Sequence, residues 1–450
     1  MERTVMADLV AWKNAPNRKP LVLFGARQVG KTWLLRELGR TQYHRVVYVS
    51  LDESSLGRRI FEPDLDPGRI LADLAVLDGG PSIDPADTLI VLDEVQESPR
   101  ALTSLKHFAE NAPDYHLACA GSLLGVAAHP DTSFPVGKVN IINVHPLTFT
   151  EFLAALGEDG LATMLRDDDL ARLEPFHDKL VSYLRWYLFV GGMPEVVAQF
   201  IPRRDTLVVR DLQRELIAGY DSDFSKHAPL TEVPRLRGLF DSIPRQLAKE
   251  NKRFVYGQAQ PGARAKTLEL ALQWLLDAGL VHRVRRVQTP RLPLSAYADD
   301  TAFKLFLLDT GLIGAMADLD PRTIVDPDAL FAEFKGALTE QYVLQSLIAA
   351  AVTPYYWTNK TGAAEIDFIL QAGAAPIPLE VKAGISRQAK SLRFYRDTYS
   401  PPVCLRATLR PYHKEDWLIN LPLYVVGRVP DLLASCATTQ SSELACTLPN

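Results

Sequence analysis

Short, mainly apolar runs recur along the first third of the chain. They cover residues 21–24, 46–52, 89–92, 117–120 and 139–144. Such runs are typical of strands that are buried on both faces of a parallel sheet. Helical periodicity fills segments between them, as at 32–38. This alternation predicts an α/β domain with a doubly wound parallel sheet over residues 1–155.

Helical periodicity dominates the middle of the chain. We expect residues 156–230 to form a helical lid. Two further helices, at 236–249 and 266–278, precede an alternating strand at 281–287 and a return strand at 303–308. The order of helix, turn, helix and β-ribbon predicts a winged helix over residues 231–320.

The last part of the chain combines a strong helix with strands. A helical stripe at 331–348 is followed by strands at 365–370 and 377–382 and a polar helix at 386–395. We expect a second α/β domain over residues 326–435. The Ser- and Thr-rich residues 436–450 are expected to form a flexible tail.

Composition narrows the functional class. The 450 residues carry a formal net charge of −5, so nucleic-acid binding would need a local basic patch. No run of eighteen apolar residues and no secretion signal is present, so we expect no membrane association and a cytoplasmic location. The four cysteines are scattered and form no zinc-binding pair, which fits a reducing compartment.

The strongest motif follows the first predicted strand. Gly25, Gly30, Lys31 and Thr32 have the spacing of a phosphate-binding loop, which brings backbone N–H groups to phosphate oxygens. Lys31 is expected to bind the β- and γ-phosphates of ATP, and the Thr32 hydroxyl to bind Mg²⁺. We expect the nucleotide to be held by Gly25, Ala26, Arg27, Gln28, Val29, Gly30, Lys31, Thr32 and Trp33. Arg27 has an alternative interpretation as a solvated spacer.

Polar residues end two other predicted strands. Asp93 and Glu94 follow an apolar run, at the edge of the sheet where the phosphate loop lies. Asp93 would hold Mg²⁺ through its second shell, and Glu94 would orient or deprotonate the attacking water. The alternative is that they cap the helix beginning near Pro99. Ser122 follows 117–120 and is either a γ-phosphate sensor or a turn serine.

A second group of charged residues lies in the C-terminal strands. Because side chains alternate along a strand, Glu380 and Lys382 share a face, and pairing of the two strands would bring Asp367 to them. Two carboxylates would bind Mg²⁺ and the lysine would orient or deprotonate water. Asp367 with a later E-x-K resembles the PD-(D/E)xK restriction-endonuclease-like fold. That resemblance implies an auxiliary metal-binding role for Glu340.

The predicted winged helix is unusually basic. Residues 232–291 contain twelve Lys or Arg against five Asp or Glu, a net charge of +7. Arg264 and Lys266 begin the expected recognition helix, and further arginines lie on the expected wing: Arg283, Arg285, Arg286 and Arg291. This charge favours contact with DNA phosphates. The alternative is an interface with an acidic protein surface.

Several motifs together resemble one protein family. They are Gly-Ala-Arg-Gln-Val-Gly-Lys-Thr at 25–32, Leu-Asp-Glu-Val-Gln at 92–96, Ala-Gly-Ser at 120–122, His-Pro-Leu-Thr-Phe-Thr-Glu-Phe at 145–152, Gly-Gly-Met-Pro at 191–194 and Leu-Asp-Thr-Gly-Leu at 308–312. The family is a group of prokaryotic AAA-type ATP-binding proteins with a C-terminal domain of unknown function. The resemblance implies the fold and ATP binding.

One position departs from this family. The family carries Gly-Arg ahead of its Pro-Leu-x-Phe stretch, where this chain has Gly137-Lys138. Lysine lacks the planar fork of arginine, so we name no arginine finger in a homo-oligomer.

The sequence thus predicts an Mg²⁺-dependent ATPase whose nucleotide state controls a DNA-binding C-terminal half. Whether that half also cleaves DNA stays open. The main alternative is a switch with a degenerate, non-cleaving nuclease fold, and a small-molecule phosphotransferase is a third.

Overall fold

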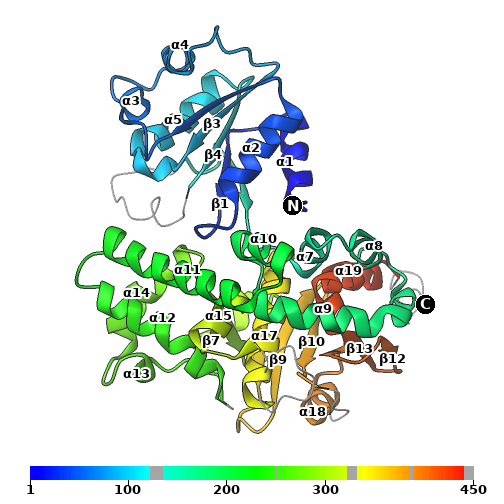
Figure 1. The fold of residues 1–450 in the computed structure, drawn as a ribbon. Helices are drawn as coiled ribbons and strands as arrows, with labels where there is room; N and C mark the ends of the chain where they lie inside the picture. Colours follow the sequence, from blue (N-terminus) through cyan, green and yellow to red (C-terminus); the bar gives the residue numbers. More distant parts are fainter. Residues whose placement is uncertain (122–134, 250, 322–331, 385–388, 440–450) are drawn as a thin grey trace.

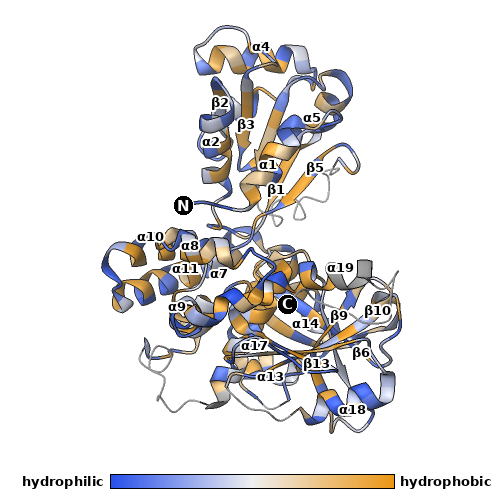
Figure 2. Ribbon diagram, turned by 90° about the vertical axis from the view of Figure 1, so that its right-hand side faces the viewer, coloured by the Kyte–Doolittle hydropathy of each residue, from blue (hydrophilic) through white to orange (hydrophobic). Residues whose placement is uncertain are grey.

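The structure is a computed structural model that describes residues 1–121, 135–249, 251–321, 332–384 and 389–439. Figure 1 shows two bodies, with the first sheet and its helices above and the rest of the chain below. Figure 2, coloured by hydropathy, shows that the strands of the first sheet are mainly apolar. This is expected for a sheet between two layers of helices.

The upper body contains a five-stranded sheet in the order β2-β3-β4-β1-β5, and all its pairs are parallel. The doubly wound parallel sheet expected in this part of the chain is therefore confirmed. Its strands and main helices are α1 (Val5–Asn14), β1 (Leu21–Phe24), α2 (Lys31–Gln42), β2 (Arg45–Ser50), α3 (Ser55–Arg59), α4 (Pro67–Asp78), β3 (Thr88–Asp93), α5 (Pro99–Asn111), β4 (His116–Ala120) and β5 (Asn140–Asn143).

Strand β1 separates two hydrophobic cores. Leu21 and Leu23 pack into one core, while Val22 and Phe24 pack into the other. The alternation follows from the two-residue period of a strand. It fixes the orientation of β1, and therefore of the loop that leaves its carboxyl end.

Helices connect the two bodies and form much of the lower one. They are α7 (Phe149–Ala155), α8 (Asp159–Met164), α9 (His177–Val190), α10 (Pro194–Arg203), α11 (Thr206–His227), α12 (Val233–Leu247), α13 (Tyr256–Ala259), α14 (Ala265–Asp277) and α15 (Thr310–Met316). The assignment of 156–230 as a lid over the nucleotide stays a prediction.

The lower body also contains an eight-stranded mixed sheet in the order β12-β13-β11-β10-β9-β8-β6-β7. Its elements are β6 (Val281–Val287), β7 (Ala298–Leu307), α17 (Ala332–Ala349), β8 (Tyr355–Thr358), β9 (Glu365–Ala372), β10 (Ala375–Val381), α18 (Lys390–Tyr399), β11 (Cys404–Thr408), β12 (His413–Lys414), β13 (Leu418–Pro422) and α19 (Val429–Thr439).

The β6–β7 ribbon is part of this sheet. It was expected as the wing of a domain at 231–320, but Arg286 and Val287 of β6 pair in parallel with Tyr356 and Trp357 of β8. Two helices and a β-ribbon lie in this part of the chain, but the ribbon continues into the C-terminal strands, and the winged helix stays a prediction. The predicted domain boundaries at residues 320 and 326 stay predictions, because one sheet contains strands from both sides of them.

Two of the family-like motifs meet inside the lower body. The buried Asp309 begins α15 by accepting from the backbone of Gly311 and Leu312, and its Oδ2 also accepts from Gly192 N at 2.7 Å. Gly191 is required here because a Cβ on it would lie 2.1 Å from Asp309 Oδ1. These motifs are structural: they join α15 to the turn between α9 and α10.

A third motif anchors the N-terminus behind the phosphate loop. The buried Glu151 accepts hydrogen bonds from the backbone N–H groups of Thr148 and Thr4, at 2.8 and 2.7 Å. Arg3 forms an ion pair with Glu151 and donates to Val29 O of the phosphate loop at 3.0 Å. The conformation of the loop is thus supported from the side opposite its expected ligand.

Candidate functional site

The phosphate loop has the backbone shape that its sequence predicts. Gly25 and Gly30 have φ values of 155° and 96°, and Gln28 has a φ of 65°. A Cβ at Gly25 would lie 2.3 Å from Val144 O, so only glycine fits there. Helix α2 begins directly after Gly30, and its N-terminus favours an anion at the loop.

Lys31 extends along this loop. Its Nζ donates to the carbonyl oxygens of Gly25 and Ala26, at 2.9 and 2.8 Å. Burial lowers the pKa of Lys31 to about 8, while the nearby carboxylates of Glu94 and Asp93 oppose that shift. Within the described residues the hydrogen-bond partners of this partly buried ammonium group are neutral carbonyls, so it is available to an anion.

Asp93 and Glu94 end β3 beside the loop. Asp93 is buried, and its two oxygens accept from Tyr48 Oη at 2.6 Å and from Glu94 N at 3.0 Å. Gln96 donates to Glu94. The helix-cap interpretation does not hold, because Ser98 caps α5 by accepting from Ala101 N at 3.3 Å.

The other loop residues differ in how far their side chains are exposed. Ala26 and Val29 are buried and support the turn, whereas Trp33 is exposed on α2. Ser122 lies outside the described residues. Lys138, at the position where the family has arginine, forms a surface ion pair with Glu110 at 2.8 Å.

Helix α11 approaches the loop from the lower body. Arg27 forms an ion pair with Asp223, and Tyr220 Oη donates to Arg27 O at 3.2 Å. Arg27 therefore contacts α11, while its side chain stays 46% exposed to solvent. Sequence reasoning missed both partners, because they lie about two hundred residues from the loop and carry no motif.

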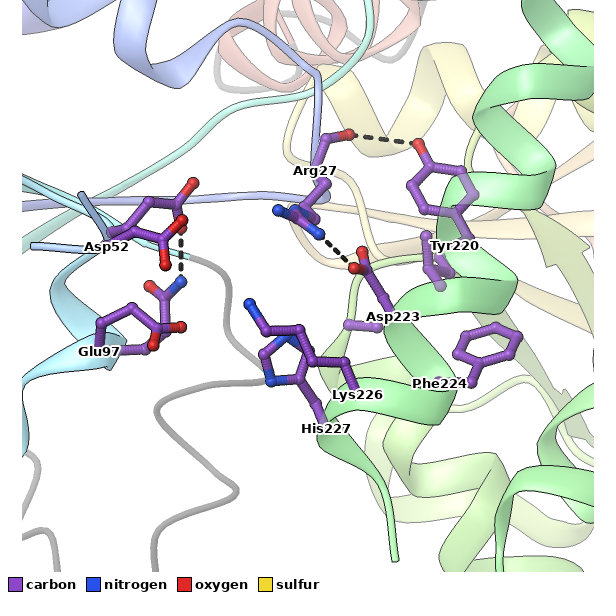
Figure 3. A pocket seen from close by; sticks show the side chains of 12 residues that line it. Arg27, Asp52, Glu97, Tyr220, Asp223, Phe224, Lys226 and His227 are labelled. Atoms are coloured by element: carbon purple, nitrogen blue, oxygen red, sulfur yellow. Dashed lines mark hydrogen bonds and ion pairs between the residues drawn. The ribbon is translucent and has the colours of Figure 1, made fainter. Parts of the chain in front are cut away.

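A small pocket lies between this helix and the carboxylates of the upper body. Figure 3 shows Lys226 pointing from α11 into the pocket, with Asp52 and Glu97 on the opposite side. Arg27, Glu94 and Gln96 also line it. Acidic and basic groups thus face each other across the pocket next to the phosphate loop.

The predicted C-terminal site residues come together in one cavity of about 700 Å³. It is lined by Glu340 of α17, Asp367 of β9, Glu380 of β10 and Lys382. Strands β9 and β10 pair antiparallel, which places Asp367 near Val381, and Val381 N donates to Asp367 Oδ2 at 2.7 Å. Lys382 Nζ lies 3.0 Å from Glu380 Oε1.

Two lysines that the sequence did not indicate also reach these carboxylates. Lys252, between α12 and α13, forms an ion pair with Glu340. Lys304 of β7 is fully buried, and its Nζ lies 2.5 Å from Glu365 Oε1 and 3.6 Å from Glu340 Oε2. The sequence pattern did not indicate these contacts, because both lysines belong to the predicted winged helix and not to the predicted C-terminal domain.

These lysines set the electrostatics of the cavity. Burial opposes ionisation of Glu340, but Lys304 and Lys252 hold its pKa below the ordinary value. Burial, with a contribution from Glu340, raises the pKa of Asp367 to about 7. The cavity therefore keeps Glu340 charged and favours a proton on Asp367.

The cavity has features that suit a cation. Oε2 of Glu340 and Oε2 of Glu380 are buried, and among the described residues neither accepts a hydrogen bond, although Lys304 Nζ lies 3.6 Å from the Glu340 oxygen. Carboxylate oxygens of this kind suit Mg²⁺. Across the described residues, no three His, Cys, Asp or Glu side chains are grouped closely enough to hold a metal ion. Assignment of Glu340, Asp367 and Glu380 as metal ligands stays a prediction.

The basic region is less free than its charge suggests. Arg283, Arg285 and Arg286 form ion pairs with Glu269, Asp300 and Asp299. By contrast, Arg264 and Lys266 are exposed at the start of α14 and enter no ion pair within the described part of the chain. The start of α14 is the better candidate for phosphate contact.

Three family models match parts of the chain. Residues 17–153 match an AAA domain, residues 181–323 match a domain of unknown function (DUF8612), and residues 335–424 match a second one (DUF4143). The chain carries an AAA-type P-loop domain. The AAA family supports ATP binding by this domain.

Solved structures resemble the chain only distantly. The Walker-type ATPase PABY2304 of Pyrococcus abyssi is 14% identical, covers 70% of this chain and 95% of its own, and has a TM-score of 0.44. The AMPPCP-bound DnaA of Aquifex aeolicus is also 14% identical, with 61% and 86% covered and a TM-score of 0.27. We take no ligand or partner from these likenesses. No curated protein matches the chain.

Among the described residues, none of the helices combines the length and apolar character that a bilayer span requires.

The pKa of Lys31 predicts a pH dependence for the AAA-type domain. Because phosphate favours the charged lysine, ATP binding should take up a proton where the free lysine has lost it. ATP affinity should therefore fall by about tenfold between about pH 7.5 and about pH 9, on a free pKa of about 8. Calorimetry in buffers of different ionisation enthalpy measures both quantities.

The matched variant is Lys31→Arg, whose side chain stays charged over this range. It should bind ATP with no proton uptake. Uptake of equal size in Lys31→Arg would contradict the assignment to Lys31.

Proposed function

We propose that this protein is an Mg²⁺-dependent ATPase whose nucleotide state controls a DNA-binding C-terminal half. The observation that carries the ATPase is the partly buried Lys31, held by carbonyl oxygens of its own loop and lying near the acidic pair at the end of β3. An ammonium group in that position can exchange its carbonyl partners for phosphate oxygens.

Each neighbouring residue has a defined task in this proposal. Lys31 and the backbone of the loop bind the β- and γ-phosphates. Thr32 offers an oxygen ligand that suits Mg²⁺, and Asp93 would hold the ion through its second shell; the ion would supply charge stabilisation on the phosphates. Tyr48 fixes the orientation of Asp93, and Gln96 fixes that of Glu94.

Glu94 is the proposed general base. It follows Asp93 with a φ of 52°, so its side chain leaves the strand in a different direction from that of its neighbour. It also lines the pocket that faces α11. A carboxylate there can orient water or accept its proton.

Control of the C-terminal half requires a physical connection. Arg27 of the phosphate loop contacts Asp223 and Tyr220 of α11, so a ligand that draws Arg27 toward phosphate would release that helix. A ligand shifts a conformational equilibrium only through such differential contacts.

A second candidate activity is Mg²⁺-dependent phosphodiester hydrolysis in the C-terminal cavity. The observation that favours it is a pair of buried carboxylate oxygens, Oε2 of Glu340 and Oε2 of Glu380, for which no hydrogen-bond donor is placed within the described part of the chain. Glu340, Asp367 and Glu380 would hold the metal, and Lys382 would orient water or offset phosphate charge. The alternative is a cavity that binds without cleaving, since fold alone does not decide activity.

The ATPase proposal predicts different effects for two variants. Lys31→Ala removes a charged phosphate partner and should weaken ATP binding by roughly 10–100-fold. Glu94→Gln keeps the shape of the site and should bind ATP normally, but hydrolyse it roughly 100-fold more slowly. Calorimetry and phosphate release measure the two effects. Absence of any ATP binding by folded wild-type protein would reject the proposal.

The DNA proposal predicts that the position of the basic residues affects DNA binding more than their number does. Arg264→Ala with Lys266→Ala should reduce the dependence of log affinity on log salt by about 2, because two phosphate contacts are lost. Arg285→Ala with Arg286→Ala removes the same formal charge but should change the slope little, since both arginines are paired with carboxylates. Fluorescence anisotropy of a labelled duplex across salt concentrations measures the slopes. Equal slopes in both double variants would contradict this placement.

The nuclease candidate predicts metal-dependent nicking of plasmid DNA in the presence of ATP. Asp367→Asn and Lys382→Ala should each slow nicking by roughly 100-fold or more. Lys249→Ala, on the exposed surface outside the cavity, is the matched control. Nicking that survives in Asp367→Asn would come from another source, and absence of nicking by wild type with ATP turnover intact would favour the non-cleaving switch.

A further inference from the structure

A groove lies beside the phosphate loop, between the N-terminal segment and the start of α2. Its volume is about 760 Å³, and Figure 1 shows α1 next to α2 in the upper body. Met6 and Val10 of α1 pack against the hydrophobic core and give the groove an apolar wall. The apolar lining residues are Met1, Met6, Ala7, Val10 and Trp33.

Trp33 lines the groove from the first turn of α2, directly after Thr32. All six tryptophans of the chain lie among the described residues, and of these only Trp33 is exposed, at 44%. It belongs to none of the hydrophobic cores of the described residues, so core packing does not account for it. An exposed indole beside a phosphate-binding loop is suited to stack on a flat ring.

The groove lies at the end of the loop that is remote from the acidic pair. In the sheet, β3 and β4 are on one side of β1 and β5 is on the other. Glu94 follows β3, whereas Arg3 of the N-terminal segment donates to His145 O, just after β5, at 2.6 Å. The γ-phosphate and the nucleoside are opposite ends of ATP. With the γ-phosphate toward Glu94, as proposed above, the nucleoside leaves the loop toward the groove.

The polar side chains of the groove are mainly engaged within the protein. Arg3 and Thr4 are both held by Glu151, through the Arg3 ion pair and a 2.8 Å hydrogen bond from Thr4 Oγ1. Both carboxylate oxygens of Glu37 accept from Arg40, at 2.6 and 2.9 Å. The other charged lining residues are exposed, and they are Glu2 and Arg166.

These charges indicate what kind of group the groove accepts. Its lining contains two acidic and two basic side chains, Glu2 and Glu37 against Arg3 and Arg166, so their formal charges cancel. A neutral, largely apolar groove suits an uncharged ring better than a further phosphate. Arg3 is the buried charged side chain of the lining, and its bonds to Glu151, Val29 O and His145 O leave it little capacity to read the edge of a base.

We propose that this groove binds the base of the nucleotide, with the ring stacked on the indole of Trp33. This inference rests on the proposed ATP binding by the phosphate loop and adds how the nucleoside is recognised. Stacking accepts any flat base, so recognition depends on ring area more than on the groups at the ring edge. Trp33 is thus the residue that distinguishes a nucleotide from a bare polyphosphate.

The test compares ATP with inorganic tripolyphosphate, which has three linked phosphates and no base. Trp33→Ala should weaken ATP binding about tenfold and leave tripolyphosphate binding unchanged. Trp33→Phe keeps a smaller aromatic face and should bind ATP with an intermediate affinity. Val76→Ala, which shortens an exposed apolar side chain on α4 outside the groove, is the matched control and should behave as wild type. Titration calorimetry of the full-length protein with Mg²⁺ measures both ligands.

Tryptophan fluorescence gives a readout that is specific to stacking. A purine stacked on an indole quenches its emission, so ATP should quench wild type, and this quenching should be absent from Trp33→Phe although the other tryptophans remain. Tripolyphosphate should quench wild type much less than ATP does. GTP should bind wild type with an affinity within roughly tenfold of that of ATP, since the two purines offer similar ring areas.

The outcomes separate this inference from the ATPase proposal. Unchanged ATP affinity in Trp33→Ala, with tripolyphosphate bound by both proteins, overturns the base site and leaves the phosphate loop standing. Equal loss of affinity for ATP and tripolyphosphate also overturns it, because Trp33 would then act on the phosphates. A preference for ATP over GTP of roughly 100-fold or more overturns recognition by stacking. Absence of binding of either ligand to folded wild type rejects ATP binding and this inference together.

Discussion

A buried lysine loses its contacts with water and needs protein partners in their place. The two candidate sites provide different kinds of partner. Lys31 has carbonyl oxygens as its direct partners, so burial lowers its pKa. Lys304 is more deeply buried, yet Glu365 and Glu340 raise its pKa above the ordinary value. The phosphate loop is therefore incomplete without an anion, whereas the C-terminal cavity already contains counter-ions for most of its charge.

The two sites therefore differ in what each needs before it is fully assembled. The loop of the AAA-type domain has its shape fixed by β1, by glycines and by Arg3 behind it. It needs only the ligand. The C-terminal cavity needs the segment after α12 to lie against α17, because one of its counter-ions, Lys252, comes from that segment. A site assembled from two parts of a chain responds to any force that moves one part against the other.

Sequence reasoning succeeded where the chemistry was local. The phosphate loop, the placement of Asp93 and Glu94 after a buried strand, and the strands of the first sheet all follow from short-range pattern. Antiparallel pairing also brought Asp367 toward the E-x-K strand, because the two strands are neighbours in the chain. Lys252, Lys304 and Asp223 could not be found in this way, since nothing near them in the sequence specifies a partner far along the chain.

The basic region shows how a charge count misleads. The window at 232–291 ended before Asp299 and Asp300, which lie on the strand antiparallel to the arginines of β6. Cross-strand pairing places these carboxylates against Arg286 and Arg285. Charge summed along a sequence ignores the partner strand, whereas Arg264, at an exposed helix start, enters no ion pair within the described residues. The same rule explains the cavity: a lysine from a basic segment becomes a counter-ion once the fold brings carboxylates to it.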